Sequence, residues 1–320
     1  KIDSLLRVLP QKSDTAKIRV YLKLANGYRR LSLDTAIHYA LTALEQSKKY
    51  KHIRYEYDAV FKLGDFNREK GNFEEAYTYL QRSLAIGIML KDTLGQAQTF
   101  NSIGNTYNKQ GNYPKALNFL LKSLEIKERL GDKHGMSNTY INIGNVYDHL
   151  SAYAKSEEYI LKGAQLKEEL GDYYGVAGAL NNLSIIYTRR YQAEKSIQTL
   201  EKVLKGYAKY MDPYLRSAVL GNLAEAYQAE RKLGKALEAA KECLKIRLDL
   251  GDSTNASYSY ITLANIEFDL KHYDAVIEYA THALKMSERM GILNHVWDAH
   301  VSLGEAYAAM RKPDKALYHY

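Results

Sequence analysis

Residues 92–131 read DTLGQAQTFNSIGNTYNKQGNYPKALNFLLKSLEIKERLG, and this stretch decides the fold because its pattern returns every 40 residues along the chain. Its small residues Gly104, Ala116 and Ser123 each belong to a row of mostly small residues with that spacing. The most regular row consists of Gly64, Gly104, Gly144, Ser184, Ala224, Ala264 and Gly304. A fixed period of about 20 to 50 residues is typical of a solenoid or another repeat array. The chain is therefore expected to contain one structural unit for each period.

Each repeat is predicted to form two amphipathic helices. Apolar and small residues recur at intervals of 3, 4 and 7, as from Phe100 to Tyr107 and from Ala116 to Leu124, which is the spacing of one helix face. Small residues allow two helices to approach closely where they cross. Glycine–aspartate pairs such as Gly131-Asp132 end one helix and cap the next. We predict an all-α fold, a right-handed α-solenoid (superhelix) of about eight helix pairs.

The order Leu/Ile-Gly-x-x-Tyr, an alanine twelve residues after the glycine and a small residue seven further on resembles the tetratricopeptide repeat, as in Ile103-Gly104-Tyr107-Ala116-Ser123. The resemblance extends from about Ala16 to Tyr320, and it departs from the common form in its length of 40 rather than about 34 residues. This longer form is similar to the repeats of kinesin light chains and bacterial peptide-pheromone receptors. The additional residues are expected to lengthen the second helix of each pair.

One array is predicted to occupy residues 1–320. Its approximate repeats are 16–50, 51–91, 92–131, 132–171, 172–211, 212–251, 252–291 and 292–320. The last repeat is truncated, because its second helix begins near Asp314 and is short. A repeat array needs a capping element at its end, so we expect the natural protein to continue.

Composition limits the class of protein. Forty-six percent hydrophobic residues support a large core, and a single cysteine excludes an internal disulfide framework. No stretch approaches the roughly 18 consecutive apolar residues of a membrane span. The 45 Lys and Arg against 37 Asp and Glu give a net charge of +8, but the basic residues occur singly or in pairs, which disfavours a nucleic-acid surface. The 29 tyrosines include a repeat row that contains Tyr107 and Tyr147, and these rings are expected to pack between helices.

No motif in the chain predicts catalysis, a cofactor or a metal. The nine histidines show no His-Glu-x-x-His spacing, and Cys243 lies in a row of small residues that is expected to be buried. No glycine-rich phosphate loop is present. This segment is therefore not expected to be an enzyme, although an output domain beyond it could be a kinase.

Asparagines are concentrated on one predicted face of the first helices. The resemblance implies that this face lines a concave groove and that asparagines there hold a peptide backbone. The candidate ligand-binding residues are Asn101, Asn105, Asn108, Asn138, Asn142, Asn145, Asn181, Asn182, Asn222 and Asn265. Asparagine is a poor helix-interior residue, and its carboxamide both donates and accepts hydrogen bonds. An alternative is that some of these asparagines only bond one another or the next helix.

Charge is distributed unevenly along the predicted groove. Residues 1–50 carry ten Lys and Arg against four Asp and Glu, whereas residues 251–300 carry three against seven. The candidate groove charges are Arg19, Lys23, Arg29, Lys62 and Arg68 in the early repeats and Asp269, Asp298 and Glu305 in the late ones. An acidic end of an extended ligand would then be oriented toward the first repeats. An ordinary solvated helix surface is the alternative.

The opening of the chain, Ile2-Asp3-Ser4-Leu5-Leu6 followed by Ser13-Asp14-Thr15-Ala16, resembles the sensor regions of bacterial histidine kinases and related regulators. This resemblance implies a sensory or interaction module that binds a peptide or protein segment, in an extracytoplasmic (periplasmic) rather than a cytoplasmic location. A constitutive assembly scaffold or homodimerisation module is the alternative, and an RNA-binding helical repeat is a third. The membrane span, if there is one, is expected outside this segment.

Overall fold

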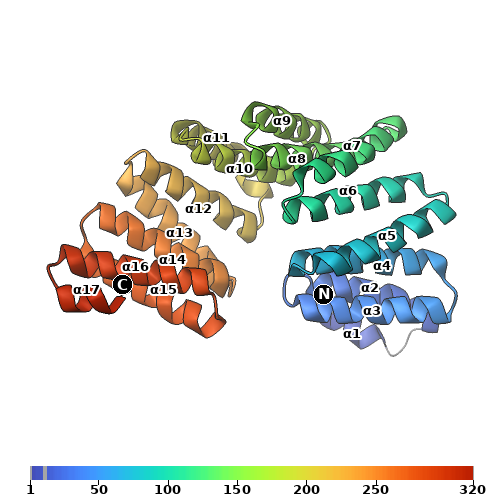
Figure 1. Ribbon diagram of the computed structural model, residues 1–320, viewed down its shortest axis with the longest axis horizontal. Coiled ribbons are helices and arrows are strands. Elements are labelled where there is room, and N and C mark those ends of the chain that lie inside the picture. Colours follow the sequence, from blue (N-terminus) through green and yellow to red (C-terminus); the bar gives the residue numbers. More distant parts are fainter. Residues whose placement is uncertain (1, 10–12, 320) are drawn as a thin grey trace. The chain divides into compact units, whose positions relative to one another are not determined.

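The computed structural model describes residues 2–9 and 13–319. All the regular elements in these residues are helical, and they follow one another in antiparallel pairs, as Figure 1 shows. The predicted all-α solenoid is therefore confirmed. The chain divides into two compact units, unit 1 at Lys1–Leu166 and unit 2 at Lys167–Tyr320.

Unit 1 begins with the short helix α1 (Ile2–Val8). Its helix pairs are α2 (Asp14–Tyr28) with α3 (Leu33–Lys49), α4 (Ile53–Lys70) with α5 (Phe73–Met89), α6 (Thr93–Lys109) with α7 (Tyr113–Leu130), and α8 (Lys133–His149) with α9 (Tyr153–Glu169), whose end passes into unit 2. Each helix from α1 to α7 packs against the next one along the chain. The first helices α2, α4, α6 and α8 also contact one another in succession, so they form a continuous surface within unit 1.

Unit 2 repeats this arrangement. Its pairs are α10 (Tyr173–Arg189) with α11 (Ala193–Tyr207), α12 (Pro213–Ala229) with α13 (Leu233–Asp249), α14 (Ser253–Asp269) with α15 (Tyr273–Met290), and α16 (Leu293–Ala309) with α17 (Pro313–His319). A short 3₁₀ helix, Ala208–Tyr210, follows α11. The first helices α10, α12, α14 and α16 contact one another in the same way as those of unit 1.

The additional residues were expected to lengthen the second helix, but the two helices of a pair are nearly equal in length. Helix α6 has 17 residues and α7 has 18, while α8 and α9 have 17 each. The extra length is therefore shared between the two helices. Two antiparallel helices bury their apolar faces along the whole length only when they are equally long.

The rows of small residues lie where two helices cross. A Cβ atom at Gly104 would lie 2.7 Å from Cγ of Leu120, which is fully buried. Ala116 and Ser123 are also fully buried. The turns between repeats have the predicted caps: Gly131 has a φ of 65°, and Asp132 accepts a hydrogen bond from the Gly135 amide at 2.9 Å. The 40-residue period is therefore set by helix crossing and capping.

The tyrosine row is packed as predicted, and from Tyr107 onwards each ring of the row has a lysine above it. The distances from Nζ to the ring centre are 5.3 Å for Lys115 over Tyr107, 5.3 Å for Lys155 over Tyr147, 5.5 Å for Lys195 over Tyr187, 5.4 Å for Lys235 over Tyr227 and 5.4 Å for Lys315 over Tyr307. Asn67 and Glu267 replace tyrosine in this row, and the lysine is missing there as well. The row therefore consists of cation–π pairs, which stabilise the helix pairs.

Candidate binding surface

Two adjoining cavities lie on the first helices of unit 1. One, of about 400 Å³, is lined mainly by α2 and α4, and the other, of about 370 Å³, mainly by α4, α6 and the start of α8. Phe61 and Gln98 line both cavities, so the two adjoin each other. We call the combined lining the first-helix surface. Its polar side chains include Arg19, Lys23, Asn26, Asp58, Lys62, Gln98, Asn101 and Asn138.

The part of this surface on α2 and α4 is basic. Arg19 and Lys23 are exposed, and neither forms a hydrogen bond or ion pair with another described residue. Lys62 donates a hydrogen bond to Oδ1 of Asn26 at 2.9 Å, and burial lowers its pKa. Burial also raises the pKa of the Asp58 carboxyl. Arg19 and Lys23 are thus the cations of this cavity that are available to a ligand.

Two of the predicted groove cations are occupied by intramolecular pairs. Arg29 contacts the Glu69 carboxylate through two nitrogens, with Nε 2.9 Å from Oε2, and this pairing raises the pKa of Arg29. Arg68 donates to Oδ1 of Asp65 at 3.1 Å. Neither arginine lines the two cavities. The sequence placed both on the correct helices but did not reveal these partners.

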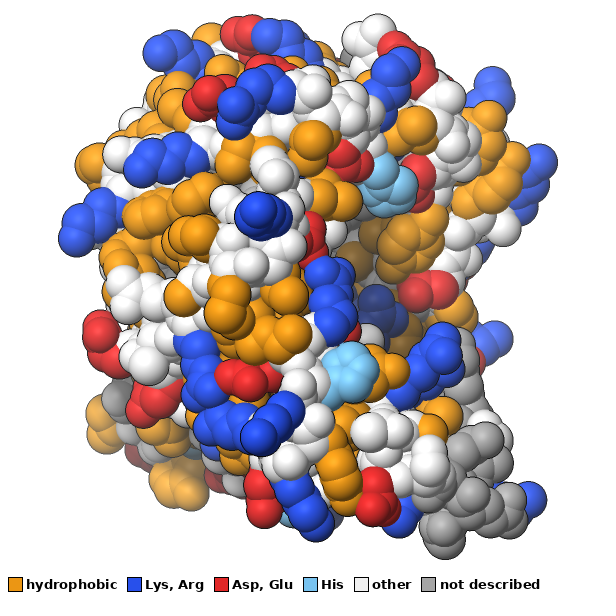
Figure 2. All heavy atoms as spheres, turned by 90° about the vertical axis from the view of Figure 1, so that its right-hand side faces the viewer, with side chains coloured by type: hydrophobic (Ala, Val, Ile, Leu, Met, Phe, Trp, Pro, Cys, Tyr) orange, Lys and Arg blue, Asp and Glu red, His pale blue; other side chains and the backbone are white. Residues whose placement is uncertain are grey.

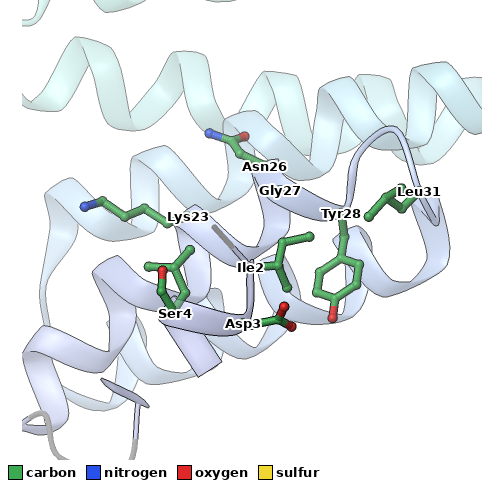
Figure 3. A pocket seen from close by; sticks show the side chains of 9 residues that line it. Ile2, Asp3, Ser4, Lys23, Asn26, Gly27, Tyr28 and Leu31 are labelled. Carbon is green, nitrogen blue, oxygen red and sulfur yellow. The ribbon is translucent and has the colours of Figure 1, made fainter. Parts of the chain in front are cut away.

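A third, open cavity of about 1050 Å³ lies between α1 and α2. Figure 3 shows Ile2 of α1 lying against α2 beside Gly27 and Tyr28. A Cβ atom at Gly27 would lie 3.1 Å from Cγ1 of Ile2, so the glycine permits this close contact. Lys23 and Asn26 line this cavity as well as the basic one. The basic end of the first-helix surface is therefore open toward α1.

The part of the surface on α6 and α8 is rich in carboxamides. Asn101 and Asn138 line its cavity, and Asn138 is exposed without a hydrogen-bond partner among the described residues. Oδ1 of Asn101 accepts hydrogen bonds from Nδ2 of Asn142 at 3.1 Å and from Oγ1 of Thr139 at 3.3 Å. The alternative stated above, that asparagines bond one another, thus applies to Asn101 and Asn142.

Lys127 reaches this cavity from a second helix. It lies in the last turn of α7, is 3% exposed, and donates to Oγ1 of Thr139 at 2.8 Å. Burial lowers the pKa of its amine to about 8, although nearby Asp132 acts in the opposite direction. A Cβ atom at Gly135 would lie 2.9 Å from Cδ of Lys127, so the glycine makes room for the side chain.

Sequence reasoning missed Lys127 because it considered positions on first helices only. A usable signal was present, since a glycine follows eight residues after Lys127 and after its counterpart Lys167 in the next repeat. Gln98, Phe61 and Asp58 were missed for another reason. They occupy predicted groove positions, but only asparagines and certain charged residues were predicted to bind a ligand there.

The other asparagines of unit 1 lie on the same helices beyond the two cavities. Asn105 and Asn145 are half-buried, and neither has a side-chain hydrogen bond to another described residue. Oδ1 of Asn108 is buried without a partner. An unpaired buried carboxamide oxygen is unfavourable by about 1–3 kcal/mol, so this atom is a candidate acceptor for a ligand or a water molecule.

The predicted residues of unit 2 also include both hydrogen-bonded and unpaired side chains. Nδ2 of Asn222 donates to Oδ1 of Asn181 at 2.9 Å, whereas Asn182 has no hydrogen-bond partner in the described part of the chain. Asp269 accepts from Arg231 at 2.5 Å and from Gln228 at 2.7 Å.

The remaining candidates of unit 2 lie on α14 and α16. Asn265 is exposed and accepts from Ser302 at 3.5 Å. Asp298 and Glu305 form no side-chain hydrogen bond or ion pair with described residues. The cavity that contains Asn222 measures only about 30 Å³, which is room for about one water molecule.

Other kinds of site are not supported by the described residues. In residues 2–9 and 13–319, no group of three or more His, Cys, Asp or Glu side chains is placed to hold a metal ion. None of the helices in that part of the chain combines the length and apolar character needed to cross a bilayer. Figure 2 shows Lys and Arg side chains mixed with acidic and hydrophobic ones on the face it presents.

Fold and surface together define a helical-repeat protein. Comparison with protein families agrees: profiles described as tetratricopeptide repeat match residues 56–129 and 176–211, and a profile described as the SusR N-terminal TPR domain matches residues 1–83. The chain is a tetratricopeptide-repeat protein. No curated protein sequence matches it significantly.

Several solved structures share the fold. One is a signal transduction ATPase with numerous domains and a tetratricopeptide repeat sensor from Pyrococcus horikoshii, with a TM-score of 0.75 and 15% identity. That match covers 99% of this chain, which spans only 50% of that protein. A Rap protein complexed with competence and sporulation factor has a TM-score of 0.69 and 17% identity, over 90% of this chain and 80% of that one. NprR in complex with its cognate peptide NprX has a TM-score of 0.56 and 14% identity, over 94% and 87%.

Proposed function

We propose that this protein is a binding module that holds an extended peptide or protein segment on the first-helix surface of unit 1. One observation carries the proposal: two adjoining cavities combine unpaired cations at one end with carboxamides at the other. A carboxamide pairs with the N–H and C=O groups of an extended backbone without reading its side chains. Convergent catalytic groups play no part in this function.

The basic residues at one end of the surface determine the orientation of the bound ligand. Arg19 and Lys23 attract an acidic side chain or end to α2 and α4, while Asn101 and Asn138 contact the backbone further along. Opposite charges at one end mainly determine orientation and association rate. Asp269, Asp298 and Glu305 belong to unit 2 and form no part of this surface. The Rap and NprR structures, which hold a signalling factor and a peptide, support a peptide ligand.

We further propose that the module is the sensory or interaction region of a bacterial signal-transduction protein. The tetratricopeptide repeat sensor of the Pyrococcus signal transduction ATPase supports this role. Ligand binding would favour one of two conformations of the array and thereby act on an output domain. A histidine kinase and a transcriptional regulator are both compatible outputs.

Selection of binders from a displayed library of random peptides tests the proposed function. We expect the full chain to enrich peptides with an acidic end, and a variant that combines Arg19→Glu with Lys23→Glu to bind them roughly tenfold more weakly. Lys48→Glu, an exposed position outside both cavities, is the matched control and is expected to bind normally. Equal binding by the double variant and the control would contradict the proposal.

A further inference from the structure

The open cavity between α1 and α2 has an apolar lining that comes from two segments of the chain. Ile2 and Leu5 lie on α1, while Tyr28 ends α2 and Leu31 lies in the turn after it. Leu31 is 69% exposed. The cavity measures about 1050 Å³, and Figure 3 shows Ile2 between Lys23 and Leu31 in its lining. The described residues thus leave apolar side chains beside an open space, which suits an apolar group of a ligand.

The space between the two helices depends on Gly27. This glycine occupies the position that Phe66 holds 39 residues later, just as Ala25 corresponds to Gly64. Phe66 is 1% exposed, so the second repeat packs a large side chain at this position. Gly27 has no side chain, and Ile2 approaches it instead, with Cγ1 3.1 Å from the place of a Cβ atom. Ile2 covers only part of the gap between α1 and α2, and the remainder is the cavity.

The lining of this cavity joins the basic part of the first-helix surface. Lys23 and Asn26 line both the α1–α2 cavity and the basic cavity on α2 and α4. Lys62 holds Asn26 through a hydrogen bond of 2.9 Å, whereas Lys23 is exposed and has no hydrogen bond or ion pair within residues 2–9 and 13–319. A carboxylate that Arg19 and Lys23 attract would therefore bring the next part of the same ligand to the edge of the α1–α2 cavity.

The charge of the cavity argues against a second acidic group there. Asp3 of α1 is exposed and lines the cavity. Its carboxylate would repel an anionic side chain, whereas Leu5 and Leu31 offer apolar contact. The group that follows the acidic one is therefore best matched by an uncharged, apolar side chain.

We propose that the α1–α2 cavity is an anchor site for an apolar side chain of the peptide ligand, located within two residues of the acidic group that Arg19 and Lys23 attract. This inference rests on the proposed function and adds a second recognition element to the same ligand. Burial of the anchor removes its surface and that of Leu31 from water, which stabilises the complex. The cavity is larger than any single side chain, so it selects for apolar character rather than for one shape.

Peptides selected on the full chain from a displayed random library provide the first test. We expect Leu, Ile, Met or Phe to be enriched within two positions of the acidic residue. One selected peptide is then made in a second form, with serine in place of the apolar residue. Isothermal titration calorimetry should show that the serine form binds the wild-type protein about tenfold more weakly.

A double-mutant cycle locates the anchor on the protein. Both peptides are titrated into Leu31→Ser and Leu5→Ser, which remove apolar surface from the two sides of the cavity. We expect the difference between the two peptides to fall from about tenfold to about threefold or less in each variant. Leu130→Ser is the matched control, because Leu130 is 50% exposed at the end of α7 and lines neither this cavity nor the first-helix surface. Leu31 is exposed, so its replacement should not impair folding.

Two results would overturn the inference. One is the absence of apolar enrichment beside the acidic residue of the selected peptides, and the other is a tenfold difference that persists in Leu31→Ser and Leu5→Ser as it does in the control. Either result leaves the proposed function standing if Arg19→Glu with Lys23→Glu still weakens binding. Normal binding by that charge variant would instead contradict the proposed function, and the anchor site with it.

Discussion

Replacing Lys127 by methionine is expected to make the protein more stable near neutral pH. The folded protein lowers the pKa of this amine from 10.5 to about 8. At about 1.4 kcal/mol for each pH unit, this corresponds to roughly 3 kcal/mol of unfavourable free energy for keeping the ammonium buried. Loss of the hydrogen bond to Thr139 offsets about 1 kcal/mol of the gain. We expect Lys127→Met to raise the free energy of unfolding by about 2 kcal/mol.

The sign of the pH dependence follows from proton binding. Between the pKa of about 8 in the folded chain and 10.5 in the unfolded chain, the unfolded state binds more protons, so the stability of the wild-type protein rises with pH in that range. The unfavourable contribution of Lys127 is complete below the lower value and absent above the upper one. The advantage of Lys127→Met should therefore be complete near pH 7 and disappear by about pH 10.5.

Urea unfolding followed by circular dichroism measures this difference. Wild type and variant are compared at each pH, so that the titration of other groups cancels. Lys167→Met is the control: Lys167 is equally buried, but it pairs with Asp172 at 2.8 Å, and its removal should lower stability. A variant at Lys127 that is no more stable than wild type near pH 7, or a gain that persists unchanged at high pH, would refute the reasoning.

Three further predictions concern the ligand surface, the helix crossing and the turns. Asn101→Asp removes the N–H donors of the Asn101 carboxamide. The variant should fold normally but bind selected peptides at least tenfold more weakly by isothermal titration calorimetry. Equal affinity would count against hydrogen-bond donation by Asn101 to the ligand. Gly104→Val forces a side chain against Leu120, 2.7 Å from the position of a Cβ, and should lower the free energy of unfolding by about 1–3 kcal/mol in urea. Tyr191→Gly should raise it by about 0.5–1 kcal/mol, because Tyr191 is 98% exposed and has a φ of 56°.

The repeat was predictable from the sequence because the same structural requirements recur in every copy. Small residues are needed where helices cross, as Gly104 is against Leu120, and several turns between repeats have a side-chain cap, as Asp132 provides for Gly135. These requirements are local and recur at a fixed spacing, so a row of small residues is sufficient to reveal them. The nearly equal lengths of α6 and α7 were not predictable from the spacing, since they depend on how two helices end against each other.

The candidate site was less predictable, because its chemistry depends on contacts between repeats. The sequence predicted that Asn101 and Asn142 lie on successive first helices, but their mutual hydrogen bond joins residues 41 apart. Lys127 was missed because it belongs to a second helix and reaches the cavity only past Gly135. Partners of this kind depend on side-chain direction as well as on the period of the repeat.

Photo-crosslinking of a selected peptide to the full chain tests the central claim most directly. A peptide that carries a photoreactive group at its centre is irradiated in complex with the protein, and the attachment site is located by mass spectrometry. The account predicts attachment on α4, α6 or α8 beside Phe61, Gln98 or Asn138, which line the two adjoining cavities. Attachment confined to α16 and α17, around the exposed Trp297 and Leu317, would contradict it and favour an assembly surface.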